Sequence, residues 1–165
     1  MTTEALRLEL GKMLDRYDEA RRLAQDRQRQ VKADDALFLQ RFADLRRGVV
    51  RPMFEAVGAI LQEHGHGFSI SEQDFAVDAS GRSTEAGIAI HILPAGTEPS
   101  LQANDPLLSL SITTRHYNKT VSIIGGEAAV PGGLAGSRGA YDLAQIDTEL
   151  IEGELLKLVA GILKG

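Results

Sequence analysis

The residues with the most obvious chemical potential are two histidines separated by one glycine, His64-Gly65-His66. Two imidazoles at this spacing can share a metal ion only in an extended or turn conformation, and a zinc site needs three or four ligands. The chain has no cysteine, and its two other histidines, His91 and His116, complete no recognisable ligand set. The sequence therefore predicts no metal site. The pair is interpreted as a polar helix end, where a histidine suits the negative pole of the helix dipole.

A second candidate is a set of polar residues that alternate with isoleucine, leucine and valine in short segments. The alternation predicts that these polar residues project from one face of a sheet. They are Ser69, His91, Ser109, Ser111, Thr113, Arg115 and Ser122. Serine, histidine and an acid are the parts of a nucleophilic triad, but no Gly-x-Ser-x-Gly elbow accompanies them. We therefore assign no catalytic residue and expect this polar face to bind a partner or a ligand.

A third candidate is the glycine-rich segment 125–139, which follows a predicted strand and contains Arg138. A glycine-rich loop after a strand can hold phosphate with its backbone amides. This segment has neither a Gly-Lys-Ser/Thr ending nor the spacing Gly-x-Gly-x-x-Gly. We therefore expect a connection between edge strands and no cofactor. The alternative is a nucleotide or small-molecule site, in a binding domain or an enzyme, with Arg138 on the anion.

The elements that position these residues begin with a helical arm at residues 1–50. Its apolar residues recur at alternating steps of three and four, which places them on one stripe of a helix. The stripe consists of Leu6, Leu10, Met13, Tyr17, Ala20 and Ala24. Such a seam is typical of a coiled coil, so the sequence predicts a homodimer joined through the arm.

The middle of the arm departs from this pattern, because Arg27, Asp34 and Arg41 occupy positions that should be apolar. Charges at such positions set the register or weaken the pairing. The same region is basic, and its exposed cations would include Arg21, Arg22, Arg27 and Arg29. The alternative interpretation is therefore a contact site for nucleic acid or another acidic partner.

Pro52 marks the boundary between the arm and a head domain at residues 51–165. Its ring removes the bond to the carbonyl of Gly48, so we expect a kink there or the start of a second helix. Period-two segments then predict strands within 68–71, 88–93, 108–113 and 121–123, with a possible edge strand at 141–146. Asp147 can cap a last helix that runs to about Leu163.

The predicted fold is α+β: a long coiled-coil-like helix, a second helix after Pro52, an antiparallel meander of four to five strands covered on one face, and a C-terminal helix. The net charge is −5, and the negative balance lies in the head, since from His64 onward there are 12 Asp/Glu against 6 Lys/Arg, which disfavours docking of that half on phosphates. The absence of cysteine and of an apolar leader favours the cytoplasm of a bacterial type. The expected function is that of a non-catalytic adaptor or scaffold, dimeric through the arm, whose head binds a protein partner.

Overall fold

The computed structural model describes residues 2–96, 108–125 and 137–164 of the chain. These residues form an α+β structure with helix from residue 3 to residue 63, a five-stranded antiparallel sheet and a C-terminal helix. The chain divides into two compact units, Met1–Leu37 and Phe38–Gly165. Phe38 and Phe42 are buried in the core of the second unit.

Helix α1 (Thr3–Leu45) begins where the Thr2 hydroxyl accepts a hydrogen bond from the Ala5 N–H at 3.2 Å. A side-chain oxygen at this position satisfies one of the N–H groups that a helix end leaves unpaired. Only Gly11 interrupts a run otherwise rich in Arg, Gln, Glu, Asp, Ala and Leu, most of which favour helix. No helix within the described residues is long and apolar enough to cross a membrane.

A π-helical turn, η1 (Arg46–Val50), joins α1 to helix α2 (Arg51–Glu63) and accommodates Pro52 without a break between the two helices. The N–H of Arg51 bonds to the carbonyl of Arg46, five residues back. Pro52 then stands in the first turn of α2 and, because it lacks an N–H, donates no bond to the preceding turn. The expected kink or break is thus a widened turn, which relieves the clash of the proline ring with the carbonyl of Gly48.

Helix α2 ends at the glycine predicted to cap it. Gly65 has a φ of 87°, in the left-handed region that glycine adopts without steric cost. The His66 N–H bonds to the Leu61 carbonyl at 3.0 Å and the Gly65 N–H to the Gln62 carbonyl at 3.0 Å. This pair of bonds is a Schellman motif, which satisfies carbonyls at the end of a helix and turns the chain into the sheet.

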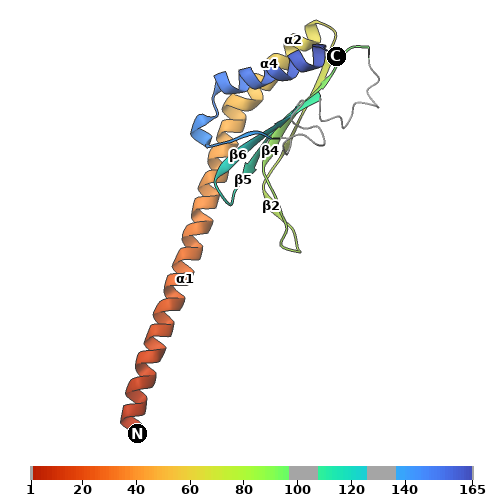
Figure 1. Cartoon of the computed structure of the whole chain (residues 1–165). Helices are drawn as coiled ribbons and strands as arrows, with labels where there is room; N and C mark the ends of the chain where they lie inside the picture. Colours follow the sequence, from red (N-terminus) through yellow and green to blue (C-terminus); the bar gives the residue numbers. More distant parts are fainter. Residues whose placement is uncertain (1, 97–107, 126–136, 165) are drawn as a thin grey trace. The chain divides into compact units, whose positions relative to one another are not determined.

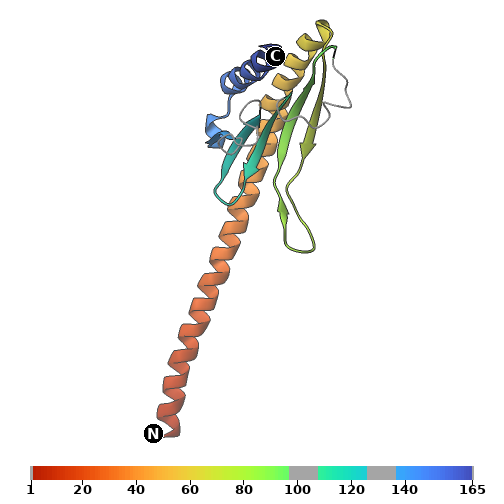
Figure 2. The ribbon, with the colours of Figure 1, turned by 45° about the vertical axis from the view of Figure 1, so that its right-hand side comes forward.

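The sheet contains strands β1 (Gly67–Gln73), β4 (Gly87–Leu93), β5 (Ser109–Arg115), β6 (Thr120–Gly125) and β7 (Ser137–Tyr141). Their spatial order is β1-β4-β5-β6-β7 and every pair is antiparallel, so the predicted meander is confirmed. A small hairpin of β2 (Ala76–Val77) and β3 (Ser83–Thr84) lies between β1 and β4 in sequence and extends past the end of the main sheet (Figure 2).

The predicted edge strand was placed too late in the sequence. The fifth strand ends at Tyr141, and Leu143–Gln145 instead forms the 3-10 turn η4. Asp142 and Gln145 form a capping box there, since the Asp142 N–H donates to Gln145 Oε1 at 2.8 Å. A reciprocal cap of this kind favours a helical start over a strand, which explains the error.

Helix α4 (Thr148–Lys164) closes the chain, and Asp147 caps it as predicted. Asp147 Oδ1 accepts a hydrogen bond from the Leu150 N–H at 2.8 Å. Helices α2 and α4 lie on the same face of the sheet (Figure 1). The apolar face of the sheet is therefore the covered one.

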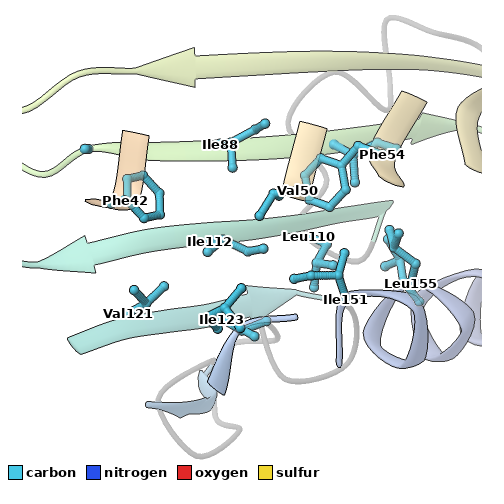
Figure 3. Close-up of a cluster of buried hydrophobic side chains, with 14 of the residues drawn as sticks. Phe42, Val50, Phe54, Ile88, Leu110, Ile112, Val121, Ile123, Ile151 and Leu155 are labelled. Carbon is cyan, nitrogen blue, oxygen red and sulfur yellow. The ribbon is translucent and has the colours of Figure 1, made fainter. Parts of the chain in front are cut away.

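The core fills the space between these helices and the sheet (Figure 3). Ile88, Ile90 and Ile92 of β4 and the inward residues of β5 and β6 pack against the helical side chains. Gly58 of α2 lies directly over the ring of Phe68. This close approach brings α2 onto β1, at the edge of the sheet.

Candidate functional site

The polar face predicted from the sequence lies on the side of the sheet opposite the buried isoleucines. The strand register places Ser69 opposite His91 and His91 opposite Ser109, so these three residues form one row across β1, β4 and β5. Directly opposed residues have Cα atoms about 4.5–5.5 Å apart. Ser69 is exposed, whereas His91 and Ser109 are half-buried.

Two further rows complete this face. One row consists of Ser71, Ala89 and Ser111. In the other row, Thr113 of β5 lies opposite Ser122 of β6. Arg115 lies two pairs further along β5 than Thr113, opposite Thr120. The structure thus places the predicted serines, Thr113 and Arg115 on a single face.

The arrangement of this face argues against a nucleophilic triad built from the strands. The outward positions of the described strands contain no Asp or Glu, and Glu72 alternates onto the opposite face. A triad needs a carboxylate that orients the histidine. The strands supply hydroxyls, one imidazole and one guanidinium, which suit hydrogen bonding to a partner.

A partly open hollow of about 280 Å³ lies on the sheet where small residues meet. It is lined in part by Ser71, Gln73, Gly87, Ser111 and Thr113. A Cβ at Gly87 would lie 3.2 Å from the Ile112 carbonyl oxygen and 3.3 Å from Thr113 Oγ1, so glycine keeps the hollow open. Neutral hydroxyls and an amide can bind a small polar group there. Glu72 also lines the hollow, and its carboxylate pairs with Arg46 and Arg51.

The structure also reveals a polar cluster that sequence reasoning missed. Glu85 Oε1 contacts His116 Nδ1, and Glu85 Oε2 accepts hydrogen bonds from Thr114 Oγ1 at 2.9 Å and from the His116 N–H at 3.1 Å. Thr114 is completely buried, and Phe75 meets the His116 ring edge-on at 4.7 Å between centroids. Lys119 Nζ donates to the His116 carbonyl at 3.1 Å.

This cluster joins the segment before β4 to the end of β5, and the Thr114 N–H adds a bond of 2.9 Å to the Ala86 carbonyl. Each group has a structural partner, so the cluster is explained by stabilisation of this end of the sheet. No signal in the sequence could have found it, because Glu85 and His116 are 31 residues apart and meet only through the strand register.

The histidine pair does not form a metal site in the described part of the chain. His66 Nδ1 accepts a hydrogen bond from the Ala95 N–H at 2.9 Å, which ties the end of α2 to the segment after β4. His64 is exposed at the C-cap of α2. Among the residues described, no group of three or more His, Cys, Asp or Glu side chains could hold a metal ion.

The glycine-rich segment 125–139 mostly falls outside the described residues, since 126–136 are not among them. Its last residues belong to β7, and a bulge between Ile123 and Ile124 accompanies their pairing with β6. The side chain of Arg138 also lies outside the description, so the predicted anion site is not defined. Gly125 itself approaches the backbone of β5 closely, because a Cβ there would lie 2.9 Å from the Cα of Leu110.

In the first compact unit, the apolar stripe of α1 is exposed. Between 46% and 63% of the surface of Leu6, Leu10, Met13 and Tyr17 is accessible. Ala20 and Ala24 are exposed on the same helix. The stripe therefore has four large apolar side chains in contact with solvent over three turns of helix.

The basic middle of α1 is partly neutralised by acids one turn away. Arg22 forms an ion pair with Glu19 at 2.6 Å, and its Nε donates to the same carboxylate at 3.2 Å. This hydrogen bond lowers the pKa of Glu19 and raises that of Arg22. Arg21 and Arg29 lie 4.0 Å and 3.9 Å from acids on the same helix. These pairs are typical of a solvated helix face and lower its attraction for phosphates.

Comparison with protein-family models, with curated proteins and with solved structures finds no match for this chain. Its function is therefore argued from its own residues.

Proposed function

We propose that this protein is a non-catalytic adaptor or scaffold that forms a homodimer through α1 and binds a protein partner through the polar face of its sheet. The exposed apolar stripe carries the proposal. Contiguous exposed apolar side chains mark association surfaces in proteins. The cytoplasmic location expected from the cysteine-free sequence belongs to the same proposal.

The seven-residue spacing of the stripe indicates that its partner is another helix, as in a coiled coil. Leu10 and Tyr17 are one heptad apart, as are Leu6 and Met13, so their side chains follow a single seam. Burying one large apolar side chain contributes about 1.5–3 kcal/mol. Several such residues from each chain can together offset the entropy lost when two chains associate.

The polar face supports the second half of the proposal, since small side chains permit close approach of another backbone. The row of Ser69, His91 and Ser109 offers hydroxyl and imidazole groups, and Arg115 adds one positive charge further along β5, opposite Thr120. A polar surface of this kind can exchange bonds to water for bonds to a partner with little desolvation of charge.

Sedimentation equilibrium tests the dimer. We expect the wild-type chain to have at least twice the monomer mass and Leu10→Asp to weaken the association through α1 by more than tenfold, because the aspartate would be buried in an apolar seam. Leu8→Asp is the matched control: Leu8 is 62% exposed and lies off the stripe, so its substitution should leave the mass unchanged. A monomeric wild-type chain, or equal effects of both substitutions, would contradict the proposal.

A further inference from the structure

Strand β1 forms one end of the five-stranded sheet, and no described strand pairs with its outer edge (Figure 2). All seven of its residues pair with β4 without a bulge. The outer edge of such a strand presents backbone N–H and C=O groups to another strand. Folded proteins normally protect exposed edges with lysine, proline, a bulge or an inward-pointing charge.

On β1 this protection is confined to the end of the strand. Glu72 is an inward-pointing charge, and its Oε1 lies 3.7 Å from Arg46 Nε and 3.4 Å from Arg51 Nη1. The segment 67–71 contains no charge, no proline and no bulge. Ser69 and Ser71 are exposed, whereas Phe68 and Ile70 are half-buried. The unprotected part of the edge is therefore Gly67 to Ser71.

We propose that a second copy of this chain occupies this edge, with the two β1 strands antiparallel about a two-fold axis at Ser69. In this register Phe68 lies opposite Ile70 of the partner subunit, and Gly67 lies opposite the partner's Ser71. Aromatic and β-branched residues form favourable cross-strand pairs. Glu72 falls beyond the apolar part of the ladder.

The geometry of antiparallel pairing is consistent with this register. A two-fold axis at a residue pairs positions that differ by an even number, so the outward backbone groups of both copies meet. The apolar faces of the two sheets also remain on the same side.

Self-complementarity favours a second copy over an unrelated peptide. In an isologous contact the same segment of the two copies pairs with itself in the reverse direction, so the residues that come to lie opposite each other must be compatible. The segment Gly67–Ser71 meets this condition, because apolar residues oppose apolar ones, small residues oppose small ones and no like charges meet. This contact uses other residues than the proposed association through α1.

Disulfide cross-linking of the full-length chain tests the register, because the natural sequence contains no cysteine. In Ser69→Cys the two cysteines would face each other with Cα atoms about 4.5–5.5 Å apart, within the range of a disulfide. In the matched control Ser71→Cys, the cysteines of the two copies would lie four positions apart along the strands, or roughly 13 Å, which a disulfide cannot span. Both sites are exposed serines of β1, so random collision affects them alike.

Under mild oxidation, we expect at least fivefold more cross-linked dimer for Ser69→Cys than for Ser71→Cys on non-reducing gels. The same ratio should persist in a Leu10→Asp background, which separates this contact from association through α1. Equal cross-linking of the two variants, or none at Ser69, would overturn the proposal. More cross-linking in a mixture of the two variants than in Ser69→Cys alone would move the axis to Ile70 and overturn the register.

Discussion

Arg46 Nη2 donates a hydrogen bond to Asp74 Oδ1 at 2.8 Å, and this contact fixes the π-helical turn to the end of the sheet. Arg46 Nη1 also donates to the carbonyls of Gln73 at 2.9 Å and Gly87 at 3.3 Å. Only 13% of the Arg46 side chain is exposed, and its guanidinium lies 5.8 Å from the centre of the Phe42 ring. One side chain thus links a helix to the ends of β1 and β4.

Replacement of Arg46 by alanine should lower the free energy of unfolding by about 2–3 kcal/mol, because two carbonyls lose a donor and a packed side chain is removed. Urea unfolding measures the change. Arg47→Ala is the control: the Arg47 side chain is 82% exposed and forms an ion pair with Asp44 one turn away, so the expected change is within about 0.5 kcal/mol. A similar loss for both variants would show that Arg46 does not have this role.

Two helical glycines should respond to alanine with opposite signs. A Cβ at Gly58 would overlap the Phe68 ring, so Gly58→Ala should destabilise the chain by about 1–3 kcal/mol despite the better helix propensity of alanine. Gly153 in α4 has no atom within 4 Å of an added Cβ, so Gly153→Ala should stabilise it by about 0.5–1 kcal/mol. Thermal unfolding of both variants measures the signs. Stabilisation by both would mean that Phe68 moves aside freely.

The pairing of Glu85 with His116 should appear as a coupling energy in a double-mutant cycle. Glu85→Ala removes the acceptor of the His116 N–H and one of two acceptors of the buried Thr114 hydroxyl, the other being the Ala86 carbonyl, at a cost of about 1–3 kcal/mol. His116→Ala removes the ring contact from the other side. Because the two residues share one network, their effects should differ from additivity by about 0.5–3 kcal/mol. Strict additivity in urea unfolding would show that they act separately.

The Asp78 carboxylate should titrate below its ordinary range. Hydrogen bonds from the Ser80 hydroxyl at 2.6 Å and from the Arg82 N–H at 3.0 Å favour its charged form and lower its pKa. A folded-state pKa below the unfolded value means that the stabilising contribution is present above the unfolded pKa and is lost as pH falls through the folded one.

Carboxyl NMR titration measures the pKa of Asp78 directly. Ser80→Ala removes the largest cause of the shift, so the pKa should rise toward its usual value. An unchanged titration in Ser80→Ala would assign the shift to the backbone donors instead.

The strands were predictable because their alternation has a local cause. Each residue of β4 from Ile88 to Ile92 faces either the core or the polar side, and the sequence records this directly. The fifth strand was placed too late because the capping box of Asp142 and Gln145, which starts a 3-10 turn at Leu143–Gln145, was not recognised in the sequence.

The contacts of Arg46 and Glu85 could not be predicted from spacing. The partners of Arg46 include backbone carbonyls, which every residue possesses, so residue type gives no signal. Glu85 reaches His116 only after β4 and β5 have paired in their observed register. The polar face was predictable as a surface, whereas its possible partner has no signature in this chain.

The π-helical turn also determines which length changes this region tolerates. Four residues of this helical stretch face the sheet although they are spaced four apart in the sequence: Phe42, Arg46, Val50 and Phe54 (Figure 3). In a regular α-helix a step of four overshoots one turn by about 40°, so the row would rotate progressively away from the sheet. The wider turn acts as a one-residue insertion that cancels part of this rotation. Deletion of the one extra residue between Arg46 and Val50 would convert the turn to regular α-helix with spacings of four, three and four residues and would keep Phe54 on this row, whereas insertion of a further residue would turn Phe54 by about 100° away from the core.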